Sequence, residues 1–190
     1  MKLFYSVLVL SICISCANTI QIEAPKPYAS WPNQEWAQAA EKAVIATGLD
    51  KAKLADEKLF CPNGLTTRNL VHLMAAIVSY ESGFKPETQY RESFKGSDGK
   101  NVISRGLFQI SFSSTQQARY GCKWDKESDL HDPIRNAQCG VQVVAALAKE
   151  NGVMTNHSGT SYKGAARYFS VMRPSGKLSQ IKNKLKVWCE

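Results

Sequence analysis

Several features that mark other classes of protein are missing from this 190-residue chain. It has no block of five or six like charges and no aromatic–basic motif of the kind that binds nucleic acid. It also lacks a C-x-x-C, a Cys–His pair at metal-ligand spacing, and any spacing that supports a nucleotide or flavin site. We therefore expect no metal, no cofactor and no nucleic-acid partner. The formal net charge of +8 would suit an anionic partner such as nucleic acid, anionic lipid or an anionic cell-wall polymer, but the lysines and arginines are dispersed, which favours a solvated surface.

The N-terminus has no apolar run long enough to span a bilayer. Residues 1–15 join one lysine to a short apolar stretch, which is the pattern of a secretory signal peptide. The stretch ends in I-C-I-S-C-A-N, which resembles a bacterial lipoprotein cleavage site with Cys16 as the lipidated residue. Simple cleavage and full secretion is the alternative. We expect an exported protein, periplasmic or secreted, whose only membrane contact would be a lipid anchor.

Four cysteines remain beyond Cys16. An exported domain with four cysteines is expected to form two disulfides, for which three pairings are possible. We favour Cys122–Cys139, which would tie a loop to the start of a helix, and Cys61–Cys189, which would fasten the chain end to the body.

Strand-like patterns are scarce, and helical periodicity is the main signal. Residues 16–30 contain two prolines and are interpreted as a linker, so the domain is expected to span residues 31–190 as a monomer. We expect helices over residues 35–47, 67–81, 133–150 and 178–188, with shorter ones over 113–120 and 164–172. The 133–150 helix is apolar on several sides, which indicates a central, buried position. The fold class is therefore mainly α, in a single domain.

One helix combines an apolar stripe with a carboxylate. Leu70, Leu73 and Ile77 recur at helical spacing, and Glu81 falls about 20° from Leu70 on the helical wheel. A carboxyl group at the end of a buried stripe tends to keep its proton, because burial disfavours the charged form. A protonated carboxyl near neutral pH is what a glycosidase needs as a general acid. A solvated or ion-paired Glu81 at the rim is the alternative.

The polar stretch of residues 85–104 is expected to be a loop or short hairpin near this acid. Glu87, Glu92 and Asp98 lie in it, and each could supply a second carboxylate or be a solvated loop charge. The following S-R-G-L-F-Q-I-S places Gln109 between apolar residues, where a buried amide needs partners.

Three segments together resemble the soluble lytic transglycosylase family, which has the lysozyme-like fold and includes relatives of goose-type lysozyme. They read Y-E-S-G-F-K-P at 80–86, S-R-G-L-F-Q-I at 104–110 and D-L-H-D-P-I-R-N-A-Q-C-G at 129–140. The resemblance implies that Glu81 is the catalytic acid. It also implies that Gln109 and Tyr168 position the sugar and that Ser82 and Ser104 brace the site. The family's A-Y-N-A-G motif is altered: Tyr168 matches, but Phe169 replaces the Asn and Val171 replaces the Gly.

The activity implied by this resemblance is cleavage of peptidoglycan strands between N-acetylmuramic acid and N-acetylglucosamine. In the first hypothesis, a lytic transglycosylase uses Glu81 alone as acid and then base, giving a 1,6-anhydro end. In the second, a hydrolytic muramidase adds Glu92 or Asp98 as a second carboxylate. In the third, which the altered motif suggests, the chain is a wall-binding or inhibitory protein with little catalytic activity.

Overall fold

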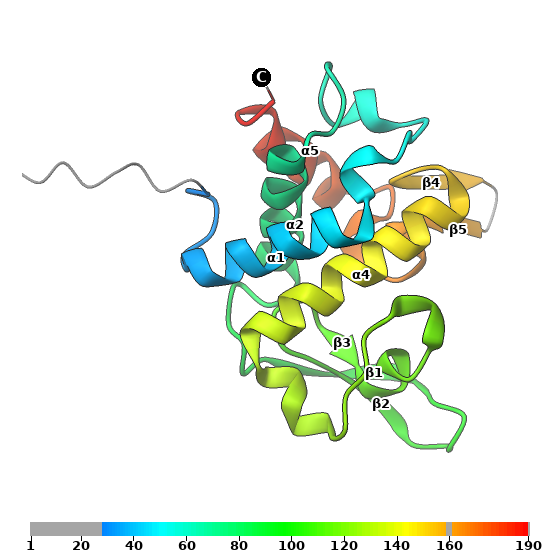
Figure 1. Ribbon diagram of the computed structural model, residues 1–190. Coiled ribbons are helices and arrows are strands. Elements are labelled where there is room, and N and C mark those ends of the chain that lie inside the picture. Colours follow the sequence, from blue (N-terminus) through cyan, green and yellow to red (C-terminus); the bar gives the residue numbers. More distant parts are fainter. Residues whose placement is uncertain (1–27, 159–160, 190) are drawn as a thin grey trace, which may run out of the picture.

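The computed structural model describes residues 28–158 and 161–189 (Figure 1). Its α-helices are α1 (Gln34–Thr47), α2 (Thr67–Glu81), α3 (Phe112–Thr115), α4 (Pro133–Asn151) and α5 (Gly176–Lys186). Its strands are β1 (Gln89–Lys95), β2 (Asn101–Arg105), β3 (Ile110–Ser111), β4 (Thr155–Ser158) and β5 (Ser161–Gly164). Single 3-10 turns are η1 (Leu49–Lys51), η2 (Glu57–Leu59), η3 (Ala118–Tyr120), η4 (Glu127–His131), η5 (Ala165–Arg167) and η6 (Ser170–Met172).

The longer helices begin at side chains that cap them. Asn33 accepts hydrogen bonds from the first backbone N–H groups of α1, and Asp132 does the same for α4, ahead of Pro133. Thr66 and Asn69 form a reciprocal capping box at the start of α2. These local signals are readable in the sequence, and the predicted helices 35–47, 67–81 and 133–150 agree with the structure to within one residue.

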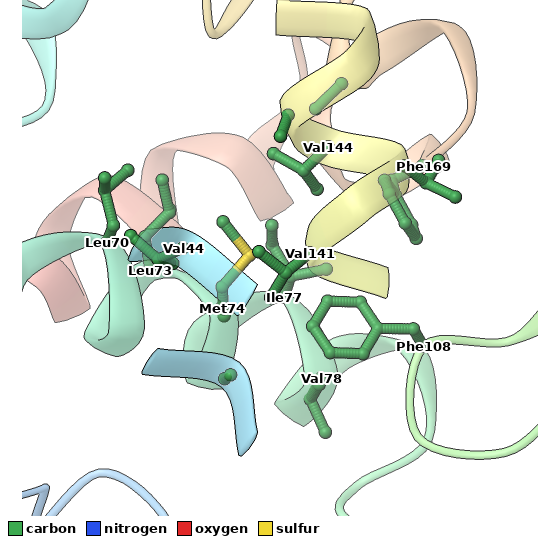
Figure 2. Packing of buried hydrophobic residues seen from close by; sticks show 14 of the residues in the cluster. Val44, Leu70, Leu73, Met74, Ile77, Val78, Phe108, Val141, Val144 and Phe169 are labelled. Atoms are coloured by element: carbon green, nitrogen blue, oxygen red, sulfur yellow. The ribbon is translucent and has the colours of Figure 1, made fainter. Parts of the chain in front are cut away.

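The core surrounds α2, which packs against α1 and α5. Leu70, Leu73, Met74 and Ile77 are fully buried along α2, as their helical spacing predicts. Figure 2 shows them beside Val44 of α1, Val141 and Val144 of α4, and the rings of Phe108 and Phe169. The single core holds the last turn of α2 in place, and the mainly α fold is confirmed.

Two small antiparallel sheets flank α4; the first contains the hairpin expected within residues 85–104, whereas the second was not expected from the sequence. The first has the order β1-β2-β3, with Tyr90 opposite Ser104 and Ser104 opposite Ser111. The second pairs β4 with β5. Gly164 takes φ 61° and packs so closely on the Val153 and Met154 carbonyls that an added Cβ would overlap them. This backbone contact breaks up the predicted 164–172 helix, which is instead β5, η5 and η6. The predicted 113–120 helix is α3 followed by η3.

Both predicted disulfides are present, as Cys61–Cys189 and Cys122–Cys139. Cys189 lies three residues beyond α5 rather than on it. The signal peptide, Cys16 and most of the predicted linker lie outside the described residues. Tyr28 is already buried and packs edge-on against His72, so the folded domain includes residues before the predicted boundary at 31. Among residues 28–158 and 161–189, no helix is both long and apolar enough to cross a bilayer.

Candidate active site

Glu81 is the last residue of α2, and the turn after it is tightly fixed. Gly83 and Phe84 both take positive φ values, 62° and 63°, which stops the helix and reverses the chain. A positive φ is unusual for a phenylalanine. The Phe84 ring packs against Trp31 at 5.7 Å between centroids, and the Trp31 indole N–H donates to the backbone of α2 at Val71. Trp31 therefore links the turn after Glu81 to the first half of α2.

The carboxyl group of Glu81 lies in an environment that favours its protonated form. Its Oε1 atom is buried and has no hydrogen-bond partner among the described residues. Burial raises the pKa of Glu81 to about 7, with Lys177 opposing this shift, Glu92 adding to it and Arg173 opposing it. At neutral pH a substantial fraction of this carboxyl group therefore carries a proton.

Glu92 is one of the three carboxylates that the sequence offers as a partner for Glu81. It lies in β1, half-buried, and its Oε1 atom accepts a hydrogen bond of 2.6 Å from the Ser104 hydroxyl of β2. Its negative charge adds to the rise in the pKa of Glu81. Ser104 is buried and holds the Glu92 side chain on this face of the sheet.

The other carboxylates of the hairpin lie elsewhere. Asp98 is exposed in the turn between β1 and β2, where its Oδ1 atom accepts the backbone N–H of Lys100 at 3.0 Å. Glu87 is exposed in the segment between α2 and β1. Of the three candidates for a second carboxylate, Glu92 is therefore the one whose charge acts on Glu81.

Gln109 is held in the loop between β2 and β3. It takes a positive φ of 48°, and its Nε2 atom donates to the carbonyls of Thr88 at 3.1 Å and Gly106 at 2.8 Å. Thr88 belongs to the segment that joins Glu81 to the strand of Glu92. The Oε1 atom of Gln109 is buried and without a hydrogen-bond partner in the described chain, so the amide keeps one acceptor for a ligand.

The Gln109 loop is shaped by residues of α4 that sequence analysis assigned no role. Asn136 is fully buried and accepts the Phe108 N–H while donating to the carbonyls of Arg105 and Leu130. A Cβ on Gly106 would overlap Leu130 and Asn136. A Cβ on Gly140 would overlap the Phe108 ring. The spacing of Asn136 and Gly140 in the third motif was the signal that could have revealed this role.

The remaining predicted site residues, Ser82 and Tyr168, both form hydrogen bonds with backbone groups. The Ser82 hydroxyl is buried and donates to the Val78 carbonyl at 3.4 Å, which caps α2 below Glu81. The Tyr168 hydroxyl accepts the Ser111 N–H at 3.1 Å, and burial raises the pKa of Tyr168. Phe169, which replaces the motif's Asn, is buried with its ring 5.9 Å from that of Phe108. This change adds to the core behind the loop.

A separate cavity of about 660 Å³ lies on the other face of the hairpin. Arg91 and Ile103, which alternate with Glu92 and Ser104 along the strands, line it together with Glu127. Asp98 also lines this cavity. This polar hollow lies between the hairpin, the start of α3 and Glu127 of η4, and Glu81 does not line it.

Comparison with known proteins now adds to this geometry. Residues 61–171 match the family model of the transglycosylase SLT domain. The chain belongs to this family. Transglycosylase SLT domains are lysozyme-like and cleave peptidoglycan, so the chain is a member of a family of glycan-cleaving, wall-acting enzymes that bind peptidoglycan. The match contains Glu81, Glu92, Gln109 and the start of α4.

Solved structures extend the likeness over most of the SLT fold. The wild-type protein DslA (Bd0314) is 32% identical, with a TM-score of 0.71, and the match covers 81% of this chain and 87% of that one. Two variants of DslA match similarly over the same shares, at 31% and 30% identity with TM-scores of 0.71 and 0.69. They replace glutamate by glutamine at positions 143 and 154 of DslA. No curated protein matches the chain significantly.

Proposed function

We propose that this SLT-family chain is a lytic transglycosylase that cleaves the β-1,4 bond between N-acetylmuramic acid and N-acetylglucosamine, with Glu81 as acid and base. The observation that carries the proposal is the buried carboxyl of Glu81, whose pKa is raised to about 7 at a rigid helix end. Such a group can give up a proton in one step and accept one in the next, because its pKa is near the working pH.

The reaction needs one carboxyl group. Glu81 donates its proton to the glycosidic oxygen, and the bond between that oxygen and the anomeric carbon breaks. The carbonyl oxygen of the substrate's own acetamide bonds to the anomeric carbon and stabilises the positive charge there. The Glu81 carboxylate then takes the proton of the 6-hydroxyl, whose oxygen displaces the acetamide and leaves a 1,6-anhydro end. Gln109, with its unpartnered acceptor, is suited to bind an N–H or O–H of the sugar.

Hydrolysis by a muramidase is the second candidate, and the position of Glu92 favours it. An inverting hydrolase needs a second carboxylate that removes a proton from the attacking water. The Ser104 hydroxyl fixes Glu92 on the side of the sheet where its charge acts on Glu81. The two DslA variants replace glutamates 11 positions apart, at 143 and 154, which is also the separation of Glu81 and Glu92. This agreement supports a pair of functional glutamates.

The products distinguish the two reactions. Purified peptidoglycan is digested with the wild type, Glu81→Gln and Glu92→Gln, and the fragments are analysed by mass spectrometry. A transglycosylase gives anhydro ends, loses about 100-fold or more of its activity in Glu81→Gln, and keeps most of it in Glu92→Gln. Reducing ends, with activity lost in both variants, would establish the muramidase instead.

A third outcome decides whether the chain is an enzyme. If Glu81→Gln still lyses walls at the wild-type rate, neither the transglycosylase nor the muramidase mechanism through Glu81 is correct. If the wild type binds walls and never cleaves them, the chain is a wall-binding protein. Lys186→Gln, at the end of α5, is a matched control because it changes an exposed charged side chain to the same amide.

A further inference from the structure

The strand that carries Glu92 also carries two exposed aromatic side chains. Tyr90 is 62% exposed and Phe94 is 58% exposed, whereas most aromatic rings of the described chain are buried or half-buried. Aromatic side chains usually bury 150–250 Å² each, so leaving two in water on one short strand loses stabilisation that burial would give. Exposed apolar groups gathered in one place mark binding surfaces.

Strand geometry places Tyr90 on the same face of β1 as Glu92. Residues two apart on a strand share a face, so Tyr90 lies with Glu92 at roughly 7 Å along β1. Tyr90 is also opposite Ser104 in the ladder, and Ser104 donates to Glu92 on that face. Phe94 lies two residues beyond Glu92, within the stretch between Arg91 and Lys95 where the ladder register shifts, so its exposure and not strand alternation places its ring at the surface. Such irregularities often re-aim side chains beside active sites.

A glycan strand fits this surface better than other ligands do. A pyranose ring has an apolar face of axial C–H groups and a polar rim of hydroxyls and acetamides. An exposed aromatic ring can pack on the apolar face while the rim stays in water. Because a polymer extends past the bond that is cut, sugars on either side of Glu81 need a surface, and binding energy from such remote sugars can assist the reaction.

We propose that Tyr90 and Phe94 form an aromatic platform on which sugar rings beyond the cleavage point stack, so that the site selects long glycan strands over short oligosaccharides. This inference rests on the proposed function for its ligand. In this proposal, Tyr90 and Phe94 of the hairpin bind sugar rings, and the bond is cleaved at Glu81 and Glu92.

Self-association through β1 is the competing occupant. β1 is an edge strand of its sheet, and unpaired edges can add a strand from another copy. However, β1 carries Arg91, Glu92 and Lys95 and an irregular ladder, and both charged residues and bulges discourage edge pairing. A glycan on the face of the strand is therefore favoured over a second copy at its edge.

Binding is measured without turnover, in a Glu81→Gln background. Titration calorimetry follows glycan strands freed of stem peptides and, separately, a disaccharide of N-acetylglucosamine. Tyr90→Ala and Phe94→Ala are each expected to weaken binding of the long strand by about fivefold to tenfold, with little effect on the disaccharide. Leu59→Ala is the control, because Leu59 is 65% exposed in η2, at the opposite end of the molecule from β1 (Figure 1). Its affinity is expected to be unchanged.

The outcomes separate this inference from the proposed function. If the Tyr90→Ala/Phe94→Ala double variant binds long strands as tightly as its parent, the platform is refuted, even if the wild type cleaves walls. If affinity falls but the wild type cleaves nothing, the platform stands and the proposed function fails. A change in sedimentation with unchanged affinity would show a self-association surface and overturn the proposal. Tyr90→Phe and Phe94→Tyr should keep the affinity, which excludes a mere folding defect.

Discussion

At the scale of single residues, the site depends on the balance of charges around Glu81. Burial raises the pKa of Glu81, whereas the cations Lys177 and Arg173 hold the shift to a pKa of about 7. Without these cations the acid would stay protonated at higher pH, and its carboxylate form would be a rarer base. Their charges also suit the anionic groups of a cell wall. In the proposed mechanism, the residues around Glu81 thus give it a pKa suited to donating a proton in one step and accepting one in the next.

Removing one of these charges should shift the pH profile. The general acid must be protonated, so activity is expected below the pKa of about 7 and lost as pH rises through it. Lys177→Ala removes a cation that lowers the pKa of Glu81, so the alkaline limb of kcat/KM should move to higher pH. The NMR titration of the Glu81 carboxyl should move the same way. Lys186→Ala, on the same helix, should move neither, and an unmoved titration in Lys177→Ala would contradict this account.

At the scale of elements, α4 fixes the conformation of the Gln109 loop. The buried Asn136 side chain makes hydrogen bonds with the backbone groups of Phe108, Arg105 and Leu130. These backbone groups are therefore satisfied although the Gln109 loop has no regular secondary structure. Gly140 leaves room for the Phe108 ring directly against the helix. Because Gln109 follows Phe108 in the chain, the packing of α4 determines where the amide of Gln109 lies.

Filling the space at Gly140 should therefore damage both stability and function. Gly140→Ala puts a methyl group into the Phe108 ring, and such overpacking costs about 1–3 kcal/mol. The displaced ring should also move Gln109 and raise KM. The control is Gly176→Ala in α5, where an added Cβ meets only open space among the described residues, so stability should be unchanged or rise by up to about 1 kcal/mol. Thermal unfolding and wall-lysis kinetics measure both effects, and equal stability in the two variants would contradict the packing argument.

At the scale of the whole molecule, two disulfides tie outlying parts of the chain to the core, because Cys61 and Cys139 are buried in it. Cys61–Cys189 closes the chain over a separation of 128 residues and fastens the end of the chain beyond α5 to the body, while Cys122–Cys139 closes a separation of 17 residues. α5 in turn packs on α2, the helix that ends at Glu81, and Lys177 is the second residue of α5. The first bridge therefore supports the element that carries Lys177, one of the two cations that act on Glu81.

The two bridges should differ in their contribution to stability. A cross-link stabilises chiefly by restricting the unfolded chain, and the effect grows with the length of the closed loop. Replacing Cys61 and Cys189 by serine should cost about 4–5 kcal/mol, against about 3 kcal/mol for Cys122 and Cys139. Urea unfolding of the two double variants measures this difference. A larger loss for the Cys122–Cys139 pair would show that native-state contacts, and not loop length, dominate.

Much of this molecule is predictable from local patterns. The spacing of Leu70, Leu73 and Ile77 predicts α2 and its buried face, and Asp132–Pro133 marks the start of α4. Motif spacing indicates the family, and four cysteines indicate two bridges. The helix signals depend on neighbours within a few residues. The family motifs and the set of four cysteines are informative because such combinations of residue types rarely occur by chance.

The sequence by itself determined the long helices α1, α2 and α4, the apolar stripe that ends at Glu81, and the family of wall-cleaving enzymes. Only the tertiary structure decided which carboxylate lies near Glu81, because Glu92 and Asp98 differ by the face and position they take on one hairpin. It also decided the β4–β5 hairpin, the part played by Asn136 and the cations at Glu81. Each of these depends on contacts between distant segments, whose free energies are set by packing and burial rather than by local preference.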